Sequence, residues 1–293
     1  MNKYSFIDLI AFIGIFVVLL LSLFLYTVKT KRKLGNRLFA FFLIANAIDA
    51  SKYLIHHIPE DFINLEVFRW SIVYLVPVSF YFYVMSVCYS NFRLKTKHLL
   101  HTIPFIAYNL NLMSGVYFDT TEMKLHFIQN MNQMPITHFF QFLFELQFQV
   151  YFIASLMIIR KSKTVYLENY TNPNISIINA LHMITIIYYI LHFLVLLRWL
   201  VTYTIGFGEI RQWIVTLDGF SFLFCTCWYL FVALNNPEFF RGVNSKLKLI
   251  TDDIVPKQKS SPTIDDEKNK QIESLKDFMI EKEPYLDSSL TIQ

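Results

Sequence analysis

Five ionisable side chains interrupt long apolar stretches of this sequence, and their types are those that bind or relay charge. They are Asp49, Lys52, Glu145, Arg198 and Asp218. Inside a membrane such side chains are costly, so they face a bundle interior or a wet cavity and are the first candidates for function. At a rise of about 1.5 Å per residue, all five fall at a similar depth, in the predicted outer half of the membrane. We therefore predict a pocket for an unknown small ligand at this level.

Aromatic side chains are expected around this pocket, namely Tyr74, Tyr81, Tyr188 and Trp199. A mixture of apolar walls and a few charged groups is typical of small-molecule sites. A second interpretation stays open for part of the set. Asp49 and Lys52 are three residues apart and can pair on their own helix, which would make them a structural salt bridge.

No motif for catalysis or metal binding accompanies these residues. The sequence has no His-Glu-x-x-His, Gly-x-Ser-x-Gly or phosphate-loop pattern, and only 7 glycines with which to build such loops. His182 and His192 fall on different helix faces and have no further ligand at metal spacing. We expect no enzyme activity, no catalytic residues, no cofactor and no metal.

Membrane helices must position the charged residues, because 55% of the 293 residues are hydrophobic and only 16% are charged. Each of seven apolar stretches has the roughly 20 residues that a bilayer-spanning helix needs. They are Ser5 to Val28, Leu38 to Ile58, Val67 to Tyr89, Leu99 to Phe118, Ile136 to Ile159, Ile175 to Ile205 and Gln212 to Leu234. The predicted fold is all-α, a seven-transmembrane-helix bundle with a short cytoplasmic helical tail.

Basic residues in the connecting loops predict the orientation, since short basic loops stay in the cytoplasm. The loops after the first, third, fifth and seventh stretches hold Lys29, Lys31, Arg32, Lys33, Arg37, Arg93, Lys95, Lys97, Arg160, Lys161, Lys163, Arg241, Lys246 and Lys248. The opposite side holds Lys3, Arg69, Lys124 and Arg211. We predict a multi-pass protein of the bacterial cell (inner) membrane, with the N-terminus outside and the C-terminus in the cytoplasm.

The composition changes after the last apolar stretch and predicts three domains: a membrane sensor domain at residues 1–237, a juxtamembrane segment and linker at 238–264, and a cytoplasmic segment at 265–293. Pro237 cannot continue a helix interior, so the last span is expected to stop there. The third segment begins with an amphipathic helix. Its apolar stripe is Ile272, Leu275, Phe278 and Met279, which we predict to relay a signal to a partner surface.

The sequence after this stripe resembles the beginning of the DNA-binding domain of AraC-type transcriptional regulators. The matching residues are Pro284, Tyr285, Leu286, Asp287, Leu290 and Thr291, with Glu283 in the place where the family has Lys. The membrane part resembles the seven-helix sensor region fused to some bacterial regulators of this family. The resemblance implies two helix-turn-helix units after Thr291, and a homodimer. Those units are missing from the sequence, so we expect no DNA-binding residue in this chain and contact with DNA only through them.

The leading hypothesis is therefore a membrane sensor that detects an extracytoplasmic or membrane-borne ligand and relays the signal to a DNA-binding output. One alternative is the input domain of a membrane sensor kinase, although the residues from Pro237 onward contain no histidine to accept a phosphate. Another is a small membrane transporter or enzyme that uses the carboxylates of Asp49, Glu145 and Asp218. Its transport or turnover would be visible in proteoliposomes.

Overall fold

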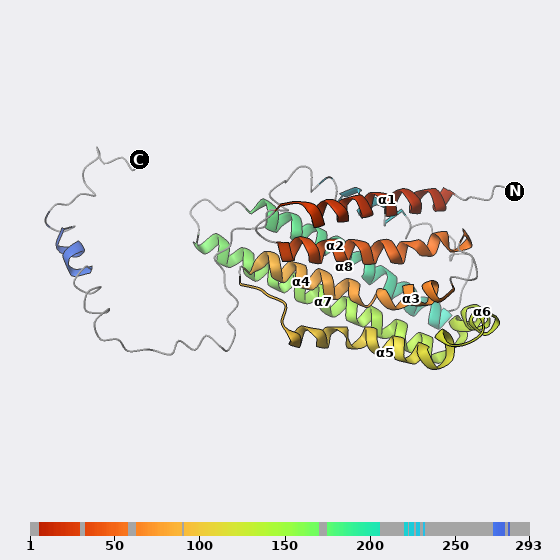
Figure 1. The fold of residues 1–293 in the computed structure, drawn as a ribbon. Coiled ribbons are helices and arrows are strands. Elements are labelled where there is room, and N and C mark those ends of the chain that lie inside the picture. The colour runs from red at the N-terminus through yellow and green to blue at the C-terminus, as the bar shows by residue number, and fades with distance from the viewer. Residues whose placement is uncertain are drawn as a thin grey trace. The chain divides into compact units, whose positions relative to one another are not determined.

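The structure is a computed structural model that describes residues 6–29, 33–57, 63–89, 91–169, 175–205, 220, 221, 223–225, 227, 228, 231, 272–278 and 281. In this part of the chain the elements are helical, which confirms the predicted all-α fold there (Figure 1). They are α1 (Phe6–Thr27), α2 (Lys33–Ala50), η1 (Ser51–His57), α3 (Ile63–Ile72), α4 (Leu75–Cys88), η3 (Thr96–Thr102), α5 (Ile103–Leu112), η4 (Met113–Tyr117), α6 (Thr121–Asn130), η5 (Met131–Gln133), α7 (Pro135–Asn169) and α8 (Ser176–Ile205).

In the described part of the chain, three helical segments are long and apolar enough to cross a membrane: Phe6–Thr27, Pro135–Glu168 and Ser176–Leu197. The bent pair of α3 and α4 makes a fourth if it is counted as one span. These segments overlap the first, fifth, sixth and third predicted spans. The chain therefore has the character of a membrane protein.

Of the other three predicted spans, the second and the fourth are not single helices that are long and apolar enough to cross a membrane. In the second, α2 carries Lys33, Arg37 and Asp49 among its 18 residues. The fourth is divided among η3, α5 and η4, and α5 has only 10 residues, which reach about 15 Å. Most of the seventh lies outside the described residues. The structure thus supports three to four spans by length and composition.

Helix α1 shows how a membrane-type helix is patterned. Its buried positions are spaced alternately by three and four residues, which places them on one face: Ala11, Gly14, Val18, Leu21 and Leu25. The opposite face is also apolar but exposed, with Phe12, Phe16, Leu20 and Leu23 each more than half accessible. A helix that is apolar all round and only half covered by protein fits a lipid environment.

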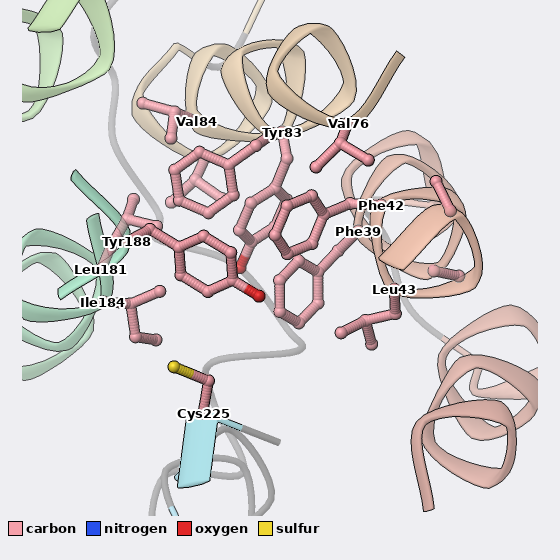
Figure 2. Close-up of a cluster of buried hydrophobic side chains, with 14 of the residues drawn as sticks. Phe39, Phe42, Leu43, Val76, Tyr83, Val84, Leu181, Ile184, Tyr188 and Cys225 are labelled. Atoms are coloured by element: carbon pink, nitrogen blue, oxygen red, sulfur yellow. The ribbon is translucent and has the colours of Figure 1, made fainter. Parts of the chain in front are cut away.

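Among the described residues, five helices supply most of the main core. The closest pairs are α1 with α2, α2 with α4, α4 with α7, and α7 with α8, and Figure 1 shows them running lengthwise beside one another. Rings from three helices meet in this core: Phe42 of α2, Tyr83 of α4 and Tyr188 of α8 (Figure 2). The rings of Phe42 and Tyr188 lie 5.4 Å apart, which ties α2 to α8.

The break between α3 and α4 bends that segment by 42°. Pro77 explains the bend, because it has no N–H and its ring clashes with the carbonyl four residues earlier, that of Val73. Shorter bonds replace the helical pattern there: the Val76 N–H donates to the Val73 carbonyl and the Tyr74 N–H to the Ser71 carbonyl, both at 3.1 Å. Pro104, in contrast, stands in the first turn of α5, where proline is well tolerated.

The chain divides into two units, residues 1–249 and 250–293. The second unit has a described helical stretch at 272–278. Three of the predicted relay residues, Ile272, Leu275 and Phe278, are exposed within it, and the fourth, Met279, lies outside the described residues.

Candidate functional site

One cavity of about 520 Å³ lies within the first unit. Helices α2, α7 and α8 supply most of its lining, and the bend between α3 and α4 supplies Val73 and Tyr74. Seven aromatic side chains surround it: Tyr53, Trp70, Tyr74, Tyr108, Phe140, Phe144 and Tyr188. The charged groups in its lining are Asp49, Lys52 and Glu145, together with His192. We call this space the Glu145 cavity.

A network of four charged residues lies beside the cavity, and two of them, Asp49 and Lys52, line it. The Arg69 guanidinium on α3 donates through Nε to Glu66 Oε2 at 2.8 Å and through Nη2 to Glu66 Oε1. Its remaining nitrogen, Nη1, donates to Asp49 Oδ1 at 3.2 Å. Lys52 Nζ lies 3.4 Å from Asp49 Oδ2. Two carboxylates thus face two cations, and each described charge in this network has an opposite partner.

Burial makes the Arg69–Glu66 half of this network the stronger one. The two side chains are only 9% and 5% exposed, whereas those of Asp49 and Lys52 are each 34% exposed. A two-pronged contact between guanidinium and carboxylate is both stronger and more directional than a single bond. Trp70, on the next position of α3, also donates through Nε1 to Glu66 Oε1 at 3.1 Å. The pair therefore fixes α3 and one aromatic ring of the cavity.

Glu145 contrasts with that network. Its side chain, on α7, is 3% exposed, and the nearest basic side chain among the described residues is the ring of His192 on α8, with Nδ1 at 3.8 Å from Oε2. That separation is too long for a hydrogen bond. Both atoms, Glu145 Oε2 and His192 Nδ1, are buried without a hydrogen-bond partner. The cavity therefore contains a carboxylate whose charge the described protein atoms leave uncompensated.

The His192 ring is held in place by packing. It stacks on Phe148 of α7, with ring centroids 3.3 Å apart and planes 17° apart. Tyr188, one helical turn earlier on α8, lies nearly parallel to His192 at 6.3 Å. The ring is consequently confined to the aromatic layer between α7 and α8, and its position does not depend on a bond to Glu145.

Tyr74 braces the bend against α7. Its hydroxyl donates to the Phe140 carbonyl at 2.6 Å. In return, the Gln147 side chain on α7 donates through Nε2 to the Tyr74 carbonyl at 3.1 Å. Tyr74 and Phe140 both line the cavity, so these two bonds hold the bend and α7 together on that side of it.

Three of the five predicted pocket residues lie together in the lining of this cavity: Asp49, Lys52 and Glu145. Arg198 lies on α8, but its side chain is outside the description, as is that of Trp199. Asp218 lies outside the described residues. His192 also lines the cavity, and Arg69 lies in the charge network beside it; neither was predicted as part of the site. Arg69 was counted as an outer loop cation, although Glu66 stands three residues before it on the same helix. No local sequence signal linked Arg69 to Asp49 or His192 to Glu145.

Tyr81, also predicted near the pocket, lies elsewhere. It packs against Tyr151 and His101, with ring centroids 5.5 Å and 6.2 Å away. Next to this group, His98 of η3 accepts a hydrogen bond at Nδ1 from the Lys95 N–H at 3.0 Å. Partial burial, and then the neighbouring charges of His101 and two lysines, lower the pKa of His98. This second cluster is a group of packed aromatic rings and lies apart from the Glu145 cavity.

Chemically, the Glu145 cavity can bind a ligand of drug-like size and orient it by charge. Among the described residues no group of three or more His, Cys, Asp or Glu side chains is arranged to hold a metal ion. Comparison of the chain with protein-family models, curated proteins and solved structures finds no match.

Proposed function

We propose that this chain is the multi-pass membrane sensor region of a bacterial AraC-type transcriptional regulator. In this proposal seven spans cross the inner membrane, the N-terminus lies outside and the C-terminus in the cytoplasm. The excess of Lys and Arg in alternate loops supports that orientation. A cysteine introduced at Pro262 is then labelled only after the cell is permeabilised, and labelling from outside would contradict it.

The observation that carries the proposal is the Glu145 cavity itself. It combines aromatic walls with a few charged groups, and three of its charged residues belong to the set that the sequence singles out for ligand binding. Its walls come from helices far apart in the chain, so a ligand there contacts several of them at once. Such a site can favour one packing of the helices over another, which is what a sensor needs.

The order of the segments along the chain suggests how a signal passes from the cavity to the C-terminal unit. Helix α8 contributes Tyr188, Leu191 and His192 to the lining. It precedes the predicted seventh span, the linker and the amphipathic stripe of the C-terminal unit. A ligand that binds one packing state of α8 more tightly shifts the population of states by its difference in affinity. The exposed stripe at Ile272, Leu275 and Phe278 supplies an apolar surface for an output domain or a second copy.

Filling the cavity tests the sensor role. Thr137 on α7 lines it, and the Thr137→Trp side chain occupies space that a ligand needs. Ile136, the preceding residue, is 44% exposed, so Ile136→Trp is a matched control on the same helix. With the gene at its native locus, Thr137→Trp is expected to change the levels of the same transcripts that deletion of the gene changes. These levels are then expected to stay constant whether or not the ligand is present.

The control variant is expected to leave those transcripts as in the wild type, and both proteins must accumulate in the membrane fraction at equal amounts. If neither deletion nor Thr137→Trp changes any transcript, the regulator proposal is wrong. Uptake of a solute by proteoliposomes that Thr137→Trp abolishes would instead favour the carrier alternative.

A further inference from the structure

Among the described residues that line the Glu145 cavity, the two carboxylates, Asp49 and Glu145, face one lysine, Lys52, and one histidine, His192. Asp49 in the lining is matched by Lys52 in the lining and by Arg69 behind it, and Arg69 also pairs with Glu66. Glu145 adds a further carboxylate, and its nearest described basic side chain is a histidine ring at 3.8 Å. The described lining therefore carries an excess negative charge at Glu145.

A buried carboxylate without a partner is unstable unless something compensates it. Its side chain is 3% exposed, so water solvates it poorly. Breaking a buried ion pair is costly for the same reason, since one charge is left uncompensated. A positively charged ligand in the cavity supplies the missing partner and gains the attraction of a weakly screened charge.

The aromatic walls favour the same kind of ligand. The ring faces of Trp, Tyr and Phe carry partial negative charge and attract cations within about 6 Å, and cages of such rings are how proteins recognise alkylated ammonium groups. Trp70, Tyr74, Tyr108, Phe140 and Tyr188 come from five different segments and line one space with Glu145. Apolar groups on an organic cation also gain from leaving water there.

We propose that the Glu145 cavity binds a small organic cation, an amine or quaternary ammonium compound, with Glu145 as its counter-ion and the aromatic rings as its cage. This inference rests on the proposed sensing role of the same cavity and names the class of ligand. An anionic ligand fits poorly, because Lys52, the one lysine in the described lining, already faces Asp49.

The test uses the purified full chain in detergent micelles with four probes. Choline and phenyltrimethylammonium are the cations, dimethylbutanol is the neutral isostere of choline, and benzoate is the anion. Binding is followed by titration of tryptophan fluorescence, because Trp70 lines the cavity, and by the shift of the thermal unfolding midpoint. Glu145→Gln removes the charge and keeps the shape. Glu168→Gln, at an exposed position of the same helix, is the matched control.

At least one of the two cations is expected to bind the wild type and Glu168→Gln with equal affinity, and to raise their unfolding midpoints. Its binding to Glu145→Gln is expected to be weaker by at least about tenfold. For the pair of isosteres, choline is expected to bind more tightly than dimethylbutanol in the wild type, and this preference is expected to disappear in Glu145→Gln.

Three results would overturn the proposal: neither cation binds, Glu145→Gln binds the cation as well as the wild type does, or benzoate binds in preference to both cations. These are measurements of binding alone and involve no transcription. If a cation binds through Glu145 but Thr137→Trp leaves all transcripts unchanged, the ligand class stands and the regulator role fails. If transcripts change but no cation binds, the sensor role stands and the ligand class fails.

Discussion

The Arg69 network beside the cavity and the Glu145–His192 pair in its lining are two charged regions of the molecule, and they differ in how a buried carboxylate is compensated. Glu66 and Glu145 are both almost fully buried carboxylates. Glu66 receives two bonds from Arg69 and one from Trp70, whereas Glu145 has only a ring nitrogen beyond bonding distance. The first region holds helices together. In the second region, the Glu145 carboxylate has no hydrogen-bond partner at Oε2 among the described residues and is available to a ligand.

Of the substitutions considered, removal of the Arg69 side chain is expected to lower the folding stability most. Arg69→Ala leaves Glu66 as an uncompensated charge that is 5% exposed, and this is expected to cost about 3–5 kcal/mol of folding free energy. The unfolding midpoint in micelles measures the loss. Arg93→Ala, at an exposed arginine, is the control and is expected to change little. An equal, small effect of both substitutions would show that the network is not structural.

The same substitution at the two glutamates gives the sharpest contrast, because the expected signs are opposite. Glu66→Gln weakens charged hydrogen bonds to Arg69 and is expected to destabilise the protein by about 1.5–3 kcal/mol. Glu145→Gln removes an unpaired buried charge and is expected to stabilise the ligand-free protein by about 1 kcal/mol or more. Unfolding midpoints measured side by side, without added ligand, decide the matter. Destabilisation by Glu145→Gln would mean that Glu145 already has a partner in the folded protein.

The smallest effect is expected at the exposed end of the network. Lys52 and Asp49 form an i,i+3 pair with side chains 34% exposed, so Lys52→Met is expected to cost less than about 1 kcal/mol. The unfolding midpoint should be measured at low and high salt, because a partly solvated pair is screened. A loss of stability as large as that of Arg69→Ala would show that Lys52, and not Arg69, makes the main contribution of the network to stability.

The contact between Asp49 and Lys52 was the easiest to predict, because residues three apart on a helix share a face. Arg69 lies on another helix, and its bond to Asp49 depends on how α3 packs beside α2. Its basic side chain was therefore counted among outer loop charges. The bend that carries Tyr74 into the cavity wall has a local cause in Pro77, but its direction depends on contacts with α7.

The sequence by itself determined the helical class and the apolar segments, because the spacing of apolar residues along α1 and the length of such runs are local properties. It also singled out Glu145 as a charge in an apolar run. Only the tertiary structure decided which charges are paired. Glu145 and His192 lie on different helices. Whether the charge of a carboxylate is compensated depends on the groups within a few ångströms of it, and these need not be its neighbours in the chain.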